Sequence, residues 1–292
     1  MTAADATAFC DIACALGEGP SWDETSGALF WFDILGRKLL ERKFDAAATV
    51  VHDLPFMASA IASIDAERQL LVADTGLYLR DRRTGALTLH TPLEADRPLN
   101  RSNDARVHPC GAFWIGTMPR DEGATSGAIY WFFRGELRLL YPGLSIPNSI
   151  CFSPDGRIAY FTDTPTGLLM RVDCDRETGL PSGVPQIFLD GRDKPGWIDG
   201  SVVDADGVLW NARWGGGAVD AWSPDGVLLR TIAVPASQST CPAFVGPEAG
   251  RIAVTSAYKG LSEAQRLADP EAGKTFLLDV EVKGRFEPRV LL

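Results

Sequence analysis

The sequence has few histidines and no paired cysteine motif. Its three histidines, His52, His90 and His108, do not have the HExxH spacing or any other paired-ligand spacing, which disfavours histidine-based zinc chemistry and a serine triad. Six cysteines are spread through 292 residues without a CxxC pair. This distribution argues against a disulfide framework or a thiolate zinc site, and it favours reduced, mostly buried thiols.

Positive charge and long hydrophobic runs are also scarce. The chain has 28 Lys and Arg residues against 38 Asp and Glu residues, a net charge of −10, which disfavours a nucleic-acid partner. No apolar run approaches the roughly 18 residues of a membrane span. The first residues are acidic where a signal peptide needs positive charge. We therefore expect a cytoplasmic protein with no nucleic-acid or membrane partner.

What the sequence does contain is a repeat. A tight acidic or glycine turn followed by a short apolar strand occurs in six segments: 23–33, 65–74, 108–117, 153–163, 204–213 and 246–256. Two further alternating segments follow each of them, separated by turn residues such as TG, DG and KG, as antiparallel hairpins require. The last predicted strand is 285–292.

Units of four short strands at this period, without helical periodicity, predict a six-bladed β-propeller that forms a single domain over residues 1–292. Each blade should have four antiparallel strands. Residues 6–14 are expected to add an outer strand to the last blade, so that strands from both chain ends close the ring. A β-sandwich is the rival fold, but it would not give a regular period. Residues 261–273 form the one predicted helical turn or long loop.

The inner strand of each unit has a candidate functional position. Counting eight residues back from the turn glycine gives Asn103, Asn148 and Asp199, and nine back in the first unit gives Glu18. The remaining two units have Ala60 and either Cys241 or Pro242 at this position. Because the inner strands line the central channel of a propeller, we expect these positions to converge.

Two carboxylates and an amide suit a hard divalent cation such as Ca²⁺, Mg²⁺ or Mn²⁺. Without a cation, Glu18 and Asp199 would repel one another, and one of them would be driven to protonate. A channel of polar residues solvated by trapped water is the alternative interpretation. Arg101 lies two residues before Asn103 on the same strand face, where it is either a donor to a polyhydroxylated ligand or a surface ion-pair partner.

Several motifs occur in order along the chain: LGEGPSW (16–22), NRSND (100–104), GTM (116–118), IPNSICFSPDG (146–156) and DGSVVDADGVLW (199–210). With these motifs the chain resembles the family of senescence marker protein, gluconolactonase and regucalcin, six-bladed propellers that hydrolyse sugar lactones with a divalent metal. The resemblance implies metal ligands at Glu18, Asn148 and Asp199.

The same resemblance implies substrate contacts at Arg101 and Asn103. A family glutamate shortly after GTM meets Asp121 here, with Glu122 next to it, so position favours Asp121 and leaves Glu122 open. Among the tryptophans, Trp197 just before Asp199 is predicted to lie at the pocket rim.

The expected function is therefore hydrolysis of a small-molecule sugar lactone by a monomer. One divalent metal ion, unassigned among Ca, Mn, Mg, Zn and Fe, would polarise the carbonyl, and Asp199 would be the general base for water. A non-catalytic calcium-binding or scaffold propeller is an alternative in which Arg101 and Asn103 are idle. A lactonase or esterase of the same fold that acts on other lactones is a second alternative.

Overall fold

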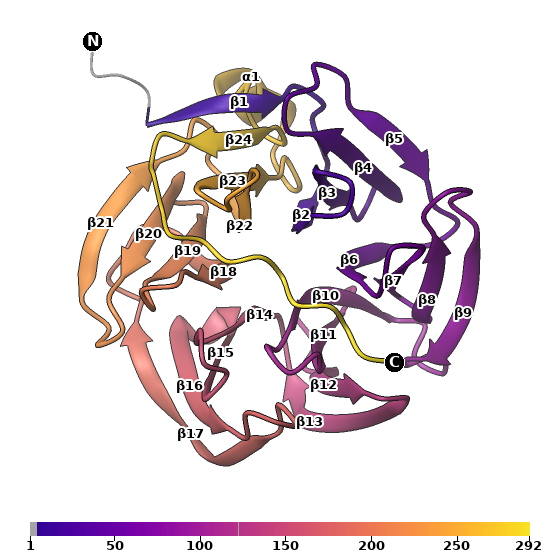
Figure 1. Cartoon of the computed structure of the whole chain (residues 1–292). Helices are drawn as coiled ribbons and strands as arrows, with labels where there is room; N and C mark the ends of the chain where they lie inside the picture. Colours follow the sequence, from indigo (N-terminus) through magenta and orange to yellow (C-terminus); the bar gives the residue numbers. More distant parts are fainter. Residues whose placement is uncertain (1–4, 122) are drawn as a thin grey trace.

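The computed structural model describes residues 5–121 and 123–292, and it shows six four-stranded antiparallel sheets arranged in a ring (Figure 1). The predicted six-bladed β-propeller is confirmed. In five blades the chain runs from the innermost strand outwards. The first three blades comprise β2 (Gly17–Asp23), β3 (Ala28–Asp33), β4 (Lys38–Lys43) and β5 (Val50–Asp53); β6 (Ala58–Ser63), β7 (Arg68–Ala73), β8 (Gly76–Asp81) and β9 (Leu87–Pro92); and β10 (Asn100–Val107), β11 (Phe113–Pro119), β12 (Gly127–Phe133) and β13 (Glu136–Leu144).

The last blade is built from both ends of the chain. β1 (Ala6–Cys10) pairs with β24 along its outer edge, with Ala6 opposite Leu278, so the predicted closure by an N-terminal strand is confirmed. The remaining blades comprise β14 (Pro147–Phe152), β15 (Ile158–Asp163), β16 (Leu168–Cys174) and β17 (Pro181–Asp190); β18 (Trp197–Val203), β19 (Leu209–Trp214), β20 (Ala218–Trp222) and β21 (Leu228–Ala233); and β22 (Ser239–Val245), β23 (Arg251–Ser256), β24 (Thr275–Leu278) and β1.

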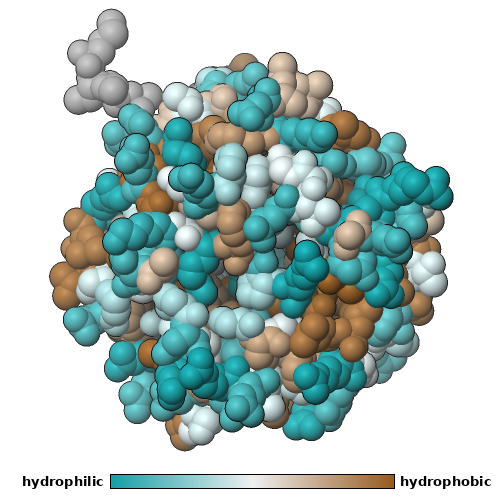
Figure 2. Space-filling model, viewed as in Figure 1, coloured by the Kyte–Doolittle hydropathy of each residue, from teal (hydrophilic) through white to brown (hydrophobic). Residues whose placement is uncertain are grey.

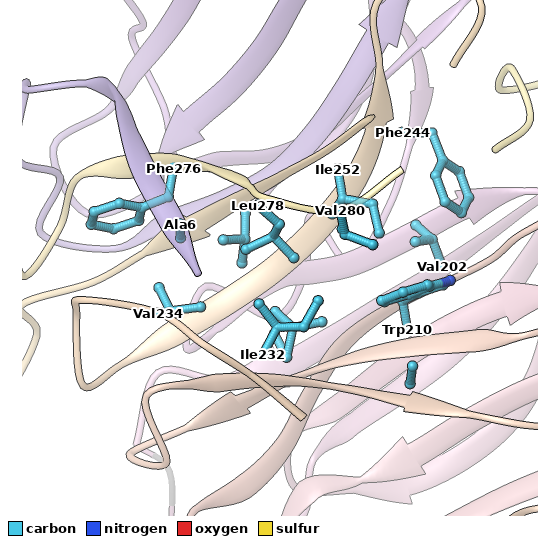
Figure 3. Close-up of a cluster of buried hydrophobic side chains, with 14 of the residues drawn as sticks. Ala6, Val202, Trp210, Ile232, Val234, Phe244, Ile252, Phe276, Leu278 and Val280 are labelled. Carbon is cyan, nitrogen blue, oxygen red and sulfur yellow. The ribbon is translucent and has the colours of Figure 1, made fainter. Parts of the chain in front are cut away.

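The hydrophobic core is divided among the blade interfaces. Six clusters of buried side chains occur in the described residues, one between each pair of neighbouring blades. Figure 3 shows the cluster in which Trp210 and Ile232 of the fifth blade face Phe276 of the last blade, beside Ala6. Burial of apolar surface at every interface therefore holds the ring together and also fixes the closing N-terminal strand.

The prediction of a strand at 285–292 is wrong. Residues 279–292, all of which the structure describes, form no strand after β24, and this C-terminal tail runs across one face of the ring (Figure 1). Backbone bonds fix it there: Val290 N donates to Ser63 O (2.9 Å), and Leu291 N donates to Gly111 O (3.0 Å). The outer edge of the last blade is already occupied by β1, so the tail has no sheet edge to join.

The tail also closes the centre of this face. Arg106 of β10 forms an ion pair with Glu287 of the tail, with Nη1 2.7 Å from Oε1, and both side chains are largely buried. In the space-filling view, side chains fill the middle of the same face, which is mainly hydrophilic with scattered hydrophobic patches (Figure 2). Access to the channel must therefore come from the opposite face.

Within the described residues, two short helical segments lie between the strands. The 3₁₀ helix η1 (Thr164–Thr166) follows β15, and α1 (Glu263–Ala268) lies within the predicted helical turn or loop at 261–273. Ser262 and Gln265 begin α1 with a reciprocal capping box. No helix in residues 5–121 and 123–292 has both the length and the hydrophobicity needed to span a membrane.

Each inner strand breaks register with its neighbour in its first half or near its middle. The shifts lie between Glu18 and Ser21, Ala58 and Ala60, Ser102 and Ala105, Asn148 and Cys151, Ile198 and Ser201, and Ser239 and Pro242. A bulge of this kind bends the strand and changes the direction of its side chains. The repeat thus places one irregular step at the channel wall in every blade.

The four polar residues that were found by counting back from the turn glycines do not all occupy the same place relative to the bulge. Glu18 and Asn148 are the last paired residues before a bulge, whereas Asn103 and Asp199 lie inside one. In the second and sixth blades the residues that match Asp199 are Ser59 and Thr240, which corrects the assignment of Ala60 and of Cys241 or Pro242.

Candidate active site

A cavity of about 530 Å³ opens at the end of the channel opposite the tail. Its wall includes Arg101 at the start of β10 and Met118 near the end of β11, whereas the tail contacts Gly111 in the turn between these strands. Five of the predicted site residues line this one cavity: Glu18, Arg101, Asn103, Asn148 and Asp199. Side chains that are 181 residues apart in sequence therefore converge.

A directional chain of hydrogen bonds connects the polar side of the cavity. Arg101 Nη1 donates to Asn103 Oδ1 (2.8 Å), and Asn103 Nδ2 donates to Asn148 Oδ1 (2.8 Å). Asn148 Nδ2 then donates to Thr164 Oγ1 (3.0 Å), and the Thr164 hydroxyl donates to Ile198 O (2.9 Å). Because arginine can only donate, it determines the orientation of both amides. The second lone pair of Asn148 Oδ1 remains available to a ligand.

Burial and neighbouring negative charge disfavour the ionised forms of both carboxylates of the cavity. Burial, together with the charge of Asp104, raises the pKa of Glu18 from 4.5 to about 8. Burial and the charge of Glu18 raise the pKa of Asp199 well above its usual range. Asp199 Oδ1 is fully buried and has no hydrogen-bond partner among the described residues. A buried acceptor of this kind is normally satisfied by a bound water or ion.

The backbone around these carboxylates is tightly held. The carbonyl oxygen of Asp199 accepts hydrogen bonds from Ser149 Oγ (2.5 Å) and Asn211 Nδ2 (3.1 Å). Gly200 packs so closely that an added Cβ would lie 2.4 Å from Cys241 Sγ. The side chain of Asp199 therefore projects from a fixed point rather than from a mobile loop.

Glu18 and Asn148 are each followed by a residue with left-handed backbone conformation. Gly19 has a φ of 55°, and an added Cβ there would lie 1.9 Å from Ser59 O, so the position requires glycine. Ser149 adopts a φ of 56° although it is not glycine. Such conformations are uncommon for non-glycine residues, so the surrounding structure holds Ser149 in place beside the cavity.

The residues present fit a hard divalent cation. Glu18, Asn148 and Asp199 offer two carboxylates and one amide oxygen in one cavity, which matches the oxygen preference of Ca²⁺, Mg²⁺ and Mn²⁺. The unpartnered Asp199 Oδ1 and the raised pKa of Glu18 both indicate missing positive charge. No cluster of three or more His, Cys, Asp or Glu side chains suited to a metal occurs within the described part of the chain, and this set has only two such residues.

Asp121 does not line the cavity. It is exposed in the loop between β11 and β12, where its Oδ1 accepts a hydrogen bond from Gly123 N (3.2 Å). Its neighbour Glu122 lies outside the described residues. A substrate contact by Asp121 therefore stays a prediction. Trp197, by contrast, lines the cavity with 51% of its surface exposed, as expected for a rim residue.

Four polar residues of the cavity wall were not predicted from the sequence. Thr164 belongs to η1, Gln238 immediately precedes β22, Lys259 follows β23, and Gln265 belongs to α1. None of them lies on an inner strand at the counted position, so the repeat gave no signal for them. Thr164 ends the segment YFTDT (160–164), which follows the IPNSICFSPDG motif closely, and could have been recognised there.

Comparison with known proteins adds a family to this geometry. The model of the SMP-30/gluconolactonase/LRE-like region matches residues 16–258, which include every residue of the hydrogen-bonded chain and both carboxylates. The chain belongs to this family. The predicted family resemblance is thereby confirmed.

Relatives of this family align with nearly the whole chain. An L-arabinolactonase of Azospirillum brasilense is 38% identical over 97% of this chain and 94% of its own length. A pentonolactonase of Haloferax volcanii is 34% identical over 97% of both chains. The crystal structure of a calcium-binding protein, regucalcin, from Agrobacterium tumefaciens is 50% identical, covers 99% of this chain and 98% of its own, and superimposes with a TM-score of 0.97.

Proposed function

We propose that this protein opens a sugar lactone to the sugar acid with the help of one divalent metal ion. Its family and its lactonase relatives support the class, that of a sugar lactonase. The observation that supports metal dependence is the buried pair of Glu18 and Asp199, one of which has an unpartnered oxygen. The six free cysteines fit a protein of the reducing cytoplasm, and we propose that it acts there as a monomer.

Each cavity residue then has a role that its geometry permits. Glu18, Asn148 and Asp199 would hold the cation, which supplies Lewis-acid polarisation of an ester carbonyl when bound. Asp199 in its ionised form would take a proton from the attacking water. Arg101 and Asn103 would bind the ring hydroxyls, because the guanidinium donates and the amide both donates and accepts.

The role of Asp199 can be tested with a matched pair of variants. Asp199→Asn keeps the shape of the side chain but removes the base, so turnover of a sugar lactone should fall by roughly 100-fold or more. Asp220→Asn is the control, since Asp220 is equally buried in the same blade but lies outside the cavity. Turnover is measured as proton release, and folding by circular dichroism. Unchanged turnover in Asp199→Asn would remove this residue from the mechanism.

Metal dependence needs a measurement that does not rely on turnover. Titration calorimetry of chelator-treated protein with Ca²⁺, Mg²⁺, Mn²⁺, Zn²⁺ and Fe²⁺ should give binding to the parent protein and weaker binding to Glu18→Gln, because one anionic ligand is lost. A lactone panel measured with each metal then identifies the active combination. Equal binding to both proteins would exclude Glu18 as a ligand.

A second candidate function is a calcium-binding propeller without catalysis. It is favoured by the half-identical structural relative, which is described as a calcium-binding protein. Arg101→Met distinguishes the two, since Arg101 bonds to Asn103 and contributes no ligand oxygen. Loss of lactone turnover with metal binding retained supports the enzyme. Absence of turnover of every lactone by the parent protein, with calcium still bound, supports the alternative.

A further inference from the structure

Lys259 contributes a second cation to the cavity. Four charged side chains line it among the described residues: Glu18, Arg101, Asp199 and Lys259. The first three belong to the predicted site, but Lys259 comes from the segment between β23 and α1, outside the repeat. Glu18, Arg101 and Asp199 each have a proposed role in the reaction, whereas Lys259 does not yet have one.

The backbone at Lys259 is fastened to the propeller. The buried amide of Gln238 donates through Nε2 to Ala257 O (3.0 Å) and to Lys259 O (3.1 Å). Ala257 also forms a bridge with Leu16, the residue that precedes β2. A lysine on a free loop would lose much entropy on binding a ligand. Here the start of the side chain is already fixed.

Lys259 lies within electrostatic range of Arg101. Burial and then the charge of Arg101 lower the pKa of Lys259 to about 8. The charge of Arg101 also acts on Glu18 and on Asp199. The cavity wall therefore combines the two carboxylates that would hold a metal with two cationic donors, and Arg101 lies near the carboxylates as well as near Lys259.

We propose that Lys259 is a specificity-determining residue that, together with Arg101, binds the hydroxyl-bearing part of a sugar lactone. This inference rests on the proposed function and extends it to a residue of the non-repeating segment. An ammonium group has three donors and no acceptor, so it suits hydroxyl or carboxylate oxygens. Arg101 and Lys259 reach the ligand from β10 and from the segment after β23, so two oxygens of one ring can be held from different directions.

Two lactones with the same ring provide the test. D-Glucono-1,5-lactone has ring hydroxyls and δ-valerolactone has none, so a residue that binds hydroxyls affects their kcat/KM values unequally. Lys259→Met removes the ammonium and keeps the apolar stem. It should lower the kcat/KM for gluconolactone relative to that for valerolactone by roughly 10-fold, mainly by raising the KM for gluconolactone. Lys259→Arg should recover part of the ratio. Lys283→Met is the control, since Lys283 is exposed and paired with Asp206 outside the cavity.

Product binding gives a readout that is independent of turnover. Trp197 and Trp214 line the cavity, so their fluorescence can report titration with D-gluconate. Weaker binding to Lys259→Met than to Lys283→Met supports the inference even if the parent opens no lactone, in which case the proposed function alone fails. An unchanged kcat/KM ratio and unchanged gluconate affinity in Lys259→Met overturn the role of Lys259 and leave the lactonase intact. A parent that neither opens lactones nor binds gluconate overturns both.

Discussion

Replacing Glu18 by glutamine should change the pH dependence of stability in the metal-free protein. The pKa of Glu18 is raised from 4.5 to about 8 in the folded state, mainly by burial. Between these values the folded protein keeps a proton that the unfolded chain releases, so the free energy of unfolding falls as the pH rises. Glutamine cannot titrate, yet it keeps an oxygen that can accept the hydrogen bond from Gly19 N (2.9 Å).

The magnitude follows from the size of the pKa shift. One pKa unit corresponds to 1.36 kcal/mol, so the parent protein should lose about 4 kcal/mol relative to the Glu18→Gln variant between pH 5 and pH 8. The glutamine variant should therefore be the more stable protein at pH 8 without metal. A bound divalent cation favours the ionised carboxylate, so added Ca²⁺ should stabilise the parent much more than the variant.

Urea unfolding in the presence of a chelator, repeated from pH 5 to pH 8, measures this difference. Glu136→Gln serves as the control, because Glu136 is exposed and Arg138 lowers its pKa, so it is ionised in both states across this range. The difference in the free energy of unfolding between Glu136→Gln and the parent should not change with pH. If the free energies of unfolding of Glu18→Gln and the parent differ by the same amount at pH 5 and at pH 8, then burial does not suppress the charge of Glu18.

Three further outcomes are expected. Glu287→Gln removes the tail's partner of Arg106 and leaves that guanidinium buried, so the free energy of unfolding should fall by about 3 kcal/mol in urea titrations, and no loss would make the ion pair dispensable. Gly200→Ala would place a Cβ 2.4 Å from a neighbouring sulfur, so thermal melting should occur earlier and lactone turnover should drop, whereas wild-type values would show that the strand can yield. Gln238→Leu leaves the carbonyl of Lys259 without its donor, and it should cost about 1 to 3 kcal/mol in unfolding experiments and raise KM for gluconolactone.

The ring could be predicted from sequence because its local and global patterns agree. Turn glycines, short apolar strands and a regular period each indicate the same four-stranded unit. The tail could not be predicted, since residues 285–292 alternate like any other outer strand. These residues form no strand because β1 already occupies the outer edge of the last blade, where they would have to pair with β24.

Only the site residues that lie on the repeated inner strands could be predicted from the sequence. From the last pair before the bulge to the closing pair, β14 advances four residues, from Asn148 to Phe152, whereas β10 advances five, from Ser102 to Val107. This shorter stretch of strand explains why Asn148 and Asn103, which are equally far from their turn glycines, differ by one residue in their position relative to the bulge. Lys259 and Gln238 were missed for another reason, since their position depends on tertiary hydrogen bonds outside the repeat.

The closure of the ring by β1 and β24 has a consequence during translation. Glu18 leaves the ribosome with the first blade, but the Thr240 hydroxyl that donates to the adjacent Gly17 O (2.6 Å) belongs to the last blade. The N-terminal strand must also wait for β24 before it can pair. Because domains fold as units once their chain is available, the nascent propeller stays incomplete until β24 has been translated. A prematurely terminated chain would therefore carry the acidic residues of the site without the architecture that makes them useful.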